Sequence, residues 1–233
     1  MDTLFDKLGL YDFFSLITGG MVFLCGNYLT GILDAKVIVN IQETLDSFLT
    51  LGLVLLVSYL LGSCFQSIAD QLFLGKYYHK LKDSILSTEE SVIGNPVKLA
   101  IHRKRACEIL ASKGILVKEE ELKKEHSSFY FGYCSYYIQT KRQHEKMEKI
   151  RGLMRLYATL IVSFFTLIVF SVIHMIFNSA EWTNQRILWG IAIYTIFMLT
   201  SCITFKATAN SWARNVVNAY DVCYDVENGL KDE

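Results

Sequence analysis

The sequence has very little proline and no excess of charge of either sign. A single proline, Pro96, occurs in 233 residues, which argues against a turn-rich β-fold and suits long uninterrupted helices. The 23 basic and 23 acidic residues give a formal net charge of zero, so no global field attracts nucleic acid or an anionic membrane. We therefore do not expect direct binding of nucleic acid.

Motifs of catalysis and metal binding are also missing. The sequence contains no P-loop, no glycine-rich dinucleotide fingerprint, no GxSxG elbow and no HExxH. Its six cysteines form no C-x-x-C pair, and none stands at metal-ligand spacing with a histidine. We expect free thiols, no metal, no cofactor and no catalytic residues, which is typical of a protein that is not an enzyme.

Apolar residues are concentrated in four runs of the sequence. The last three runs carry no formal charge and have about the length of helix that crosses a ~30 Å hydrocarbon core. The first run is less apolar, and the net acidic residues before it exclude a secretory signal peptide. The sequence predicts an all-α membrane protein with four transmembrane helices, at Tyr11–Leu33, Phe48–Phe65, Leu156–Phe177 and Ile187–Phe205.

Basic residues predict the orientation of these spans. The stretch Gln66–Met154 contains 16 Lys and Arg, whereas the two short connections between paired spans contain only Lys36 and Arg186. By the positive-inside rule, the central segment and both termini are cytoplasmic, and we expect a multi-pass protein of the bacterial inner membrane. The predicted segments are a first transmembrane hairpin (1–66), a cytoplasmic helical domain (67–154), a second hairpin (155–206) and a cytoplasmic C-terminal amphipathic helix (207–233).

Periodic spacing predicts that helices continue beyond the spans. Apolar residues recur every four positions after the second span, at Phe73, Tyr77, Leu81 and Ile85, and again after the fourth, at Trp212, Val216, Tyr220 and Tyr224. Both stretches are therefore expected to form amphipathic helices. The C-terminal one is expected to end at Asn228-Gly229.

Two more helices are predicted in the central segment. Pro96 suits the first turn of a helix that extends to about Ser112, with Gly114 as its cap. A further helix is expected to begin near Lys118, with acidic residues in its first turn, and to continue through Met154 into the third span.

Aromatic and basic side chains are the unusual features of the central segment. The aromatic cluster could be a stacking platform for a ligand or, as we favour, a helix core. The basic residues could form a solvated face, contact phosphates, or bind an acidic protein partner. The cluster is Phe129, Tyr130, Phe131, Tyr133, Tyr136 and Tyr137, and the candidate partner-binding residues are Arg103, Lys104, Arg105, Lys123 and Lys124.

Small residues line one face of each span. In lipid, small side chains let helix backbones approach closely, so we interpret these stripes first as packing faces and expect a homo-oligomer. A pore lined by hydroxyl groups, including those of Thr159, Ser163 and Thr166, is the alternative. The candidate packing residues are Ser15, Gly19, Gly26, Ser58, Gly62 and Gly190.

The layout of the chain resembles a known family. The entry Tyr11-Asp12-Phe13-Phe14, followed by Gly19-Gly20, and the order of two spans, a helical insert and two spans are similar to the membrane subunit of the bacterial Kiwa antiphage defence system. The entry motif is similar to the start of many small bacterial membrane proteins, in which the second element is usually Pro-Gly rather than Gly-Gly. The resemblance implies an oligomeric membrane sensor coupled to a soluble effector, and it transfers no functional residue.

Two functions follow as hypotheses. The first is a non-enzymatic membrane sensor or scaffold that oligomerises and docks a cytoplasmic protein, and it requires an exposed polar surface and dry spans. The second is an oligomeric ion channel or membrane-permeabilising effector, which requires a continuous wetted path.

Overall fold

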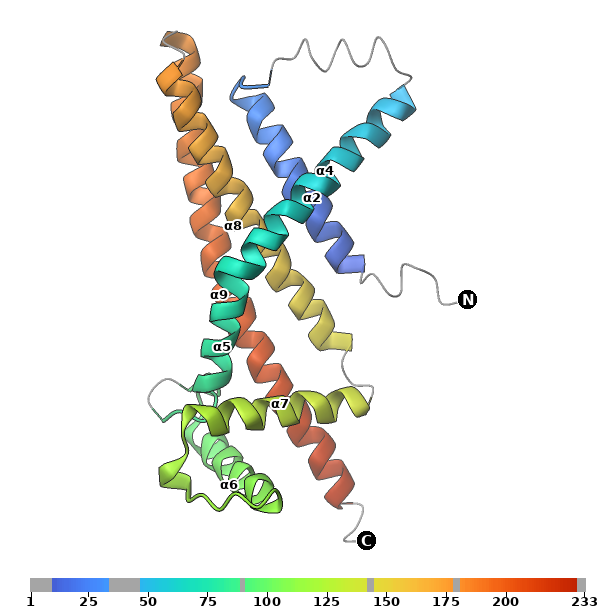
Figure 1. The fold of residues 1–233 in the computed structure, drawn as a ribbon, viewed down its shortest axis with the longest axis vertical. Helices are drawn as coiled ribbons and strands as arrows, with labels where there is room; N and C mark the ends of the chain where they lie inside the picture. Colours follow the sequence, from blue (N-terminus) through green and yellow to red (C-terminus); the bar gives the residue numbers. More distant parts are fainter. Residues whose placement is uncertain (1–9, 34–46, 89–90, 142–144, 178–180, 230–233) are drawn as a thin grey trace. The chain divides into compact units, whose positions relative to one another are not determined.

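The computed structural model describes residues 10–33, 47–88, 91–141, 145–177 and 181–229, and these contain helices but no strand. The all-α prediction is therefore confirmed for this part of the chain (Figure 1). The chain divides into two compact units, Met1–Leu74 with Gly152–Lys206 and Gly75–Arg151 with Ala207–Glu233. We name them the apolar unit and the polar unit, respectively.

The apolar unit contains the long hydrophobic helices. Three stretches are long and apolar enough to cross a membrane, namely Ser47–Ser84, Met147–Phe177 and Gln185–Asp225. They contain the second, third and fourth predicted spans. The first predicted span forms α2 (Leu10–Leu29), whose apolar part is the shorter stretch Phe13–Leu29.

Helix α2 contacts three other helices of its unit along one face. It packs against α4 (Ser47–Ala69), α8 (Glu145–Phe177) and α9 (Glu181–Gly229), as the contacts of its glycines show. Its buried residues are small or polar, among them Ser15, Asn27 and Thr30. The face of α2 that meets other helices does not need to be apolar, which accounts for its small and polar residues, whereas Phe14, Tyr28 and Leu29 lie on its exposed side.

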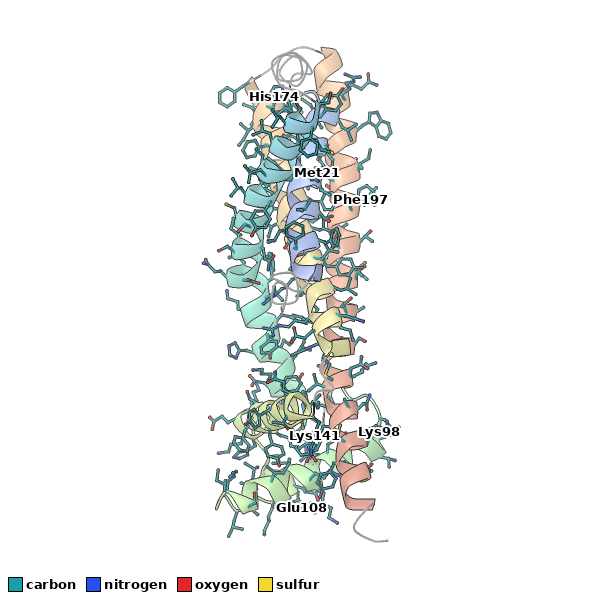
Figure 2. All side chains as sticks on the ribbon, turned by 90° about the vertical axis from the view of Figure 1, so that its right-hand side faces the viewer. Met21, Lys98, Glu108, Lys141, His174 and Phe197 are labelled. Atoms are coloured by element: carbon teal, nitrogen blue, oxygen red, sulfur yellow. The ribbon has the colours of Figure 1, made fainter. Side chains whose placement is uncertain are left out.

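The surrounding helices expose large apolar side chains. Phe197 of α9 is 53 % exposed and projects outward in Figure 2. Exposed apolar surface of this extent needs cover by lipid or protein, so it supports a membrane setting. Other examples are Leu49, Leu56 and Leu60 of α4, Phe165 and Ile173 of α8, and Ile196 and Ile203 of α9.

A π-helical turn changes the expected face after the second span. Helix α4 continues through η1 (Asp70–Leu74) into α5 (Gly75–Ser84), as predicted, but η1 inserts an extra residue into the helical repeat. Phe73 is consequently exposed, and Tyr78 rather than Tyr77 stacks on Trp212 with ring centroids 4.9 Å apart. Of the four predicted positions, Leu81 and Ile85 are buried, Tyr77 is half-buried and Phe73 is exposed.

Helix α6 (Pro96–Ser112) has the predicted limits. Asn95 caps it, because its side-chain oxygen accepts the N–H groups of Val97 and Lys98. Gly114, with φ of +81°, ends it in the left-handed conformation that glycine tolerates.

The prediction of one helix from Lys118 into the third span is wrong. The structure has a 3₁₀ turn, η2 (Glu119–Glu121), then α7 (Lys124–Thr140) and a separate α8 that begins at Glu145. Extended backbone at Leu122 and Lys123 separates the turn from α7. The middle of the stretch, HSSFYFGYCSYY, is poor in strong helix formers, and α7 buries Tyr130, Phe131, Cys134 and Ile138 on one face.

The aromatic cluster forms the core of the polar unit. Tyr130 and Phe131 of α7 are fully buried, and Phe131 lies 5.2 Å from Trp212 between ring centroids. Tyr220 of α9 stacks edge-on with Tyr130, Tyr133 and Tyr137. Phe129 and Tyr136, at 42 % and 69 % exposed, stand outside the core. The C-terminal amphipathic segment is part of α9, which is a single helix of 49 residues.

Candidate functional site: a basic hollow in the polar unit

The predicted packing residues of the apolar unit lie at helix contacts within one chain. A Cβ atom built on Gly62 would lie 1.7 Å from the carbonyl oxygen of Leu16, so only glycine fits there. Cβ atoms on Gly19, Gly26 and Gly190 would lie 2.5 to 2.6 Å from side chains of Thr159, Leu167 and Thr30, respectively. These glycines therefore join α2 to α4, α8 and α9 and do not by themselves indicate a second copy.

The two predicted packing serines are also enclosed within the apolar unit. Ser15 is buried, and its hydroxyl lies 3.3 Å from Oε1 of Gln66 in a hydrogen bond. Ser58 is buried against Gly20, whose Cβ would lie 1.8 Å from the Ser58 carbonyl oxygen. Gly20 was not among the predicted packing residues, although its neighbour Gly19 was.

Several hydroxyl groups of the predicted spans are bonded to backbone carbonyls. Thr159 and Thr166 donate to the carbonyls of Arg155 and Val162, four residues earlier, at 2.8 Å. Ser163 lies within hydrogen-bond distance of two carbonyls, those of Thr159 and Gly19. Such back-bonding satisfies the hydroxyl without water. In the described part of this unit, Asn27 Oδ1 and Ser171 Oγ are the buried side-chain atoms without a hydrogen bond.

In the polar unit, Arg105 is engaged in an internal ion-pair network. It contacts Asp221 and lies 2.7 Å from Asp225 Oδ1, and its guanidinium stands 4.7 Å from the ring centroid of Tyr224. Burial acts to lower the pKa of Arg105, but Asp221 and Asp225 outweigh it, and the pKa is raised. This residue joins α6 to α9 and is not available as a surface contact for a partner.

A buried histidine extends this network. His102 is fully buried, its Nδ1 lies 2.9 Å from the Tyr130 hydroxyl, and its Nε2 lies 3.1 Å from Asp221 Oδ2. The second contact has ion-pair distance but not the angles of a hydrogen bond. Burial raises the pKa of Tyr130, with Cys134, Tyr220 and Asp221 adding to the effect. Sequence reasoning treated His102 only as part of a basic run, because its burial depends on α7 and α9.

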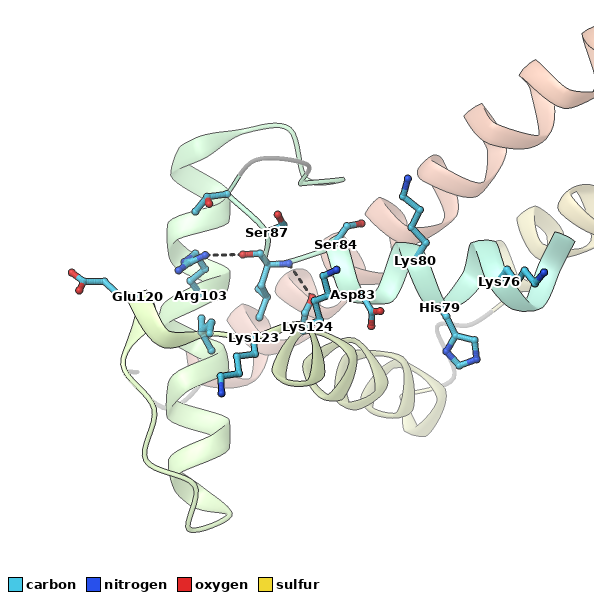
Figure 3. Close-up of a pocket in the computed structure, with 14 residues that line it drawn as sticks. Lys76, His79, Lys80, Asp83, Ser84, Ser87, Arg103, Glu120, Lys123 and Lys124 are labelled. Carbon is cyan, nitrogen blue, oxygen red and sulfur yellow. Dashed lines mark hydrogen bonds between the residues drawn. The ribbon is translucent and has the colours of Figure 1, made fainter.

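A hollow of about 880 Å³ opens between α5, α6 and the start of α7 (Figure 3). Basic side chains dominate its lining. Glu120 is drawn pointing away from the other labelled residues, whereas Asp83 stands among them. The titratable lining residues are Lys76, His79, Lys80, Asp83, Arg103, Glu120, Lys123 and Lys124, and the lining hydroxyls include Ser84, Ser87, Thr88 and Ser127.

Arg103 and Ser127 hold the wall of this hollow in place. Arg103 Nη1 donates to the carbonyl of Leu86 at 2.7 Å, and Nη2 donates to the carbonyl of Glu119. Ser127 Oγ accepts the N–H of Leu86 at 3.1 Å and donates to the carbonyl of Lys82 at 2.7 Å. Residues of α6 and α7 thus fix the segment after α5, which forms one wall of the hollow.

The five predicted partner-binding residues therefore separate into three groups. Arg105 lies in the internal network, and Lys104 is exposed on α6 outside the hollow. Arg103, Lys123 and Lys124 come together in the lining of the hollow, although Lys123 and Lys124 follow Arg103 by 20 and 21 residues in the sequence. Lys76 and Lys80 were not predicted as site residues, since only the fold brings α5 beside α7.

The hollow and its surroundings show no metal site. Among the described residues, no group of three His, Cys, Asp or Glu side chains is placed to hold a metal ion. All six cysteines are free, and Cys134 is fully buried in the core of the polar unit. Burial raises the pKa of the Cys134 thiol, which favours its neutral, unreactive form.

Comparison with known proteins gives no match: no family model fits this sequence, and no curated protein or solved structure is significantly similar to it.

Proposed function

We propose that this chain is a non-enzymatic sensor or scaffold with four membrane spans, whose polar unit docks an acidic cytoplasmic protein. In this proposal it belongs to the bacterial inner membrane, forms a homo-oligomer, and has both termini in the cytoplasm. The 16 Lys and Arg of Gln66–Met154 support the orientation. A place in antiphage defence rests on the layout shared with the Kiwa membrane subunit.

The observation that favours a scaffold over a channel is the hydrogen bonding of the span hydroxyls. A wetted path needs polar groups that face water along the spans. The hydroxyls that could line such a path, those of Thr159, Ser163 and Thr166, are instead bonded to backbone carbonyls. Close glycine contacts fill the space between α2 and its neighbours. These contacts support dry packing of α2 against its neighbours.

The exposed face of α6 supports docking by the polar unit. Val97 and Ile101 are 69 % and 45 % exposed, and Lys104 and Glu108 extend the same face. The residues Gly75–Arg151 carry 16 basic and 10 acidic side chains, a net charge of +6. Apolar anchors within a positive surface suit a partner that carries apolar and acidic side chains.

Site-specific cross-linking tests the proposal in cells. A photoreactive amino acid at Ile101 should capture one defined protein, and Lys104→Glu should reduce the yield by reversing a neighbouring charge. Lys113→Glu is the matched control, because Lys113 is exposed but lies beyond the end of α6. The same probe at Val57, in a span, should capture no soluble protein.

The channel alternative has its own outcome. If no protein is captured from Val97, Ile101 or Lys104, and the purified chain conducts ions across liposomes, the scaffold proposal is wrong. The mass of the detergent-solubilised protein, measured by native mass spectrometry, tests the oligomer, since one copy has a mass of 26.7 kDa.

A further inference from the structure

We propose that the basic hollow of the polar unit is a binding site for a phosphate group. This inference goes beyond partner docking on α6 and does not depend on it, because every residue that carries it lines the hollow. The ligand class follows from the charge, the fixed geometry and the donor groups of the lining.

The lining has an excess of positive charge. Lys76, Lys80, Arg103, Lys123 and Lys124 stand against two carboxylates, those of Asp83 and Glu120. No described acidic side chain lies within ion-pair distance of any of the five cations. Like charges gathered without partners repel one another, and an anionic ligand removes that cost.

Arg103 differs from Arg105, two residues along the same helix. Both are held firmly, but Arg105 is neutralised by two carboxylates, whereas Arg103 donates only to uncharged carbonyls. Arg103 therefore presents a full positive charge from a fixed position in the wall. A guanidinium held in this way suits recognition of an anion without further ordering.

The start of α7 adds backbone donors. Lys123 occupies the cap position, and an ammonium group has no acceptor for the first N–H groups of the helix. His126 Nδ1 accepts the N–H of Lys123 at 3.1 Å, so the side-chain contact at this end of the helix comes from His126 and not from Lys123. These donors and the helix dipole favour an anion beside Lys123 and Lys124.

These donors fit phosphate better than carboxylate. A phosphate has three or four acceptor oxygens in a tetrahedral arrangement and can carry two negative charges, so lysines, a guanidinium and backbone N–H groups can contact it from several sides. A carboxylate has two oxygens in one plane and one charge. A volume of about 880 Å³ also leaves room for the group that bears the phosphate.

Two sources supply this chemistry, a lipid headgroup and a soluble phosphate compound. Lys76 follows the apolar run Phe48–Phe65 closely in sequence and lies on the helix that continues from it. Basic residues that follow a span attract anionic headgroups, so phosphatidic acid is the lipid probe. Inorganic pyrophosphate is the soluble probe.

The test uses the full chain in nanodiscs of phosphatidylcholine, with pyrophosphate binding measured by calorimetry. Lys123→Gln with Lys124→Gln should weaken binding about tenfold by removing two charged contacts. Lys104→Gln with Lys113→Gln removes the same charge from exposed positions outside the hollow and should leave binding unchanged. A second variant, Arg103→Gln, should also weaken binding, with folding checked by circular dichroism.

The lipid arm repeats the comparison in nanodiscs that also contain phosphatidic acid, with retained lipid counted by native mass spectrometry. Retention that requires Lys123 and Lys124, without pyrophosphate binding, identifies a headgroup site. Pyrophosphate binding that requires them identifies a soluble ligand. The proposal is overturned if neither probe binds, or if the hollow variants and the exposed control variants lose binding equally.

Discussion

Gly20 of α2 lies against the backbone of Ser58 of α4, so closely that a Cβ atom on the glycine would stand 1.8 Å from the Ser58 carbonyl oxygen. In the same way, a Cβ atom on Gly62 of α4 would stand 1.7 Å from the carbonyl oxygen of Leu16 of α2. Each helix thus places one glycine against the backbone of the other helix. Without these two glycines the helices could not approach to backbone contact.

The first prediction concerns this crossing. Gly20→Ala should lower the free energy of unfolding by about 1–3 kcal/mol, because the added methyl group meets the backbone of α4, which cannot move aside. The transition can be followed in detergent by tryptophan fluorescence during titration with SDS. Gly52→Ala is the control, since Gly52 lies in α4 with open space around it and should be neutral or slightly stabilising. Equal losses in the two variants would contradict the crossing.

The second prediction concerns the ion pair between α6 and α9. Arg105→Gln and Asp221→Asn should each destabilise the protein by about 1–3 kcal/mol, and the double variant should lose much less than their sum. The pair is largely enclosed, with side-chain exposures of 17 % and 20 %. The exposed pair Arg151–Glu148, at 3.9 Å, is the control, and Glu148→Gln should change stability by less than about 0.5 kcal/mol. Additive single effects at Arg105 and Asp221 would show that the contact contributes nothing.

The third prediction is a loss of stability in alkali. Burial raises the pKa of Tyr130 and of Tyr220 above the ordinary value of 10.0. The unfolded chain therefore loses these protons at lower pH than the folded chain. The contribution of both groups is fully present below pH 10 and is lost as the pH rises above it. Unfolding midpoints from pH 8 to 11 should fall less in Tyr130→Phe than in the natural chain.

Tyr136→Phe is the control for this experiment, because Tyr136 is 69 % exposed. It should leave the pH dependence of the midpoint unchanged. If Tyr130→Phe and Tyr136→Phe give the same curve as the natural chain, the buried hydroxyl of Tyr130 does not control alkaline unfolding.

The fourth prediction concerns orientation. In a variant whose six cysteines are replaced by alanine, a new cysteine at Lys113 should be protected from a membrane-impermeant maleimide in intact cells. A new cysteine at Ser179 should be labelled, because the connection between the third and fourth spans is expected outside. Lys113 is exposed, so protection there reports the membrane rather than burial in protein. Opposite labelling would reverse the proposed topology.

The parts of the fold that sequence could predict depend on neighbouring residues. The limits of α6 follow from Asn95, Pro96 and Gly114, which act on the backbone next to them. The long apolar helices follow from the lack of charge over a stretch of membrane-crossing length, and three of the four predicted spans have that length and composition. Ser179 and the connection Asp34–Asp46 lie outside the described residues.

The remaining features depend on residues that are distant in sequence. No glycine or proline occurs between Lys141 and Glu145, so the separation of α7 from α8 has no local signal. The π-helical turn at Asp70–Leu74 likewise shifts the buried face without a distinctive residue. The hollow could not be predicted, because its lining comes from three helices that only the fold brings together.

The contact between Thr30 and Gly190 has a consequence for the order of folding. A Cβ atom on Gly190 would lie 2.5 Å from the Thr30 side chain, although the two residues are 160 positions apart in sequence. Because α2 is translated before α8 and α9, the contacts of Gly19, Gly26 and Thr30 with these two helices can form only after the later helices have been synthesised. Packing of α2 is therefore completed late in translation.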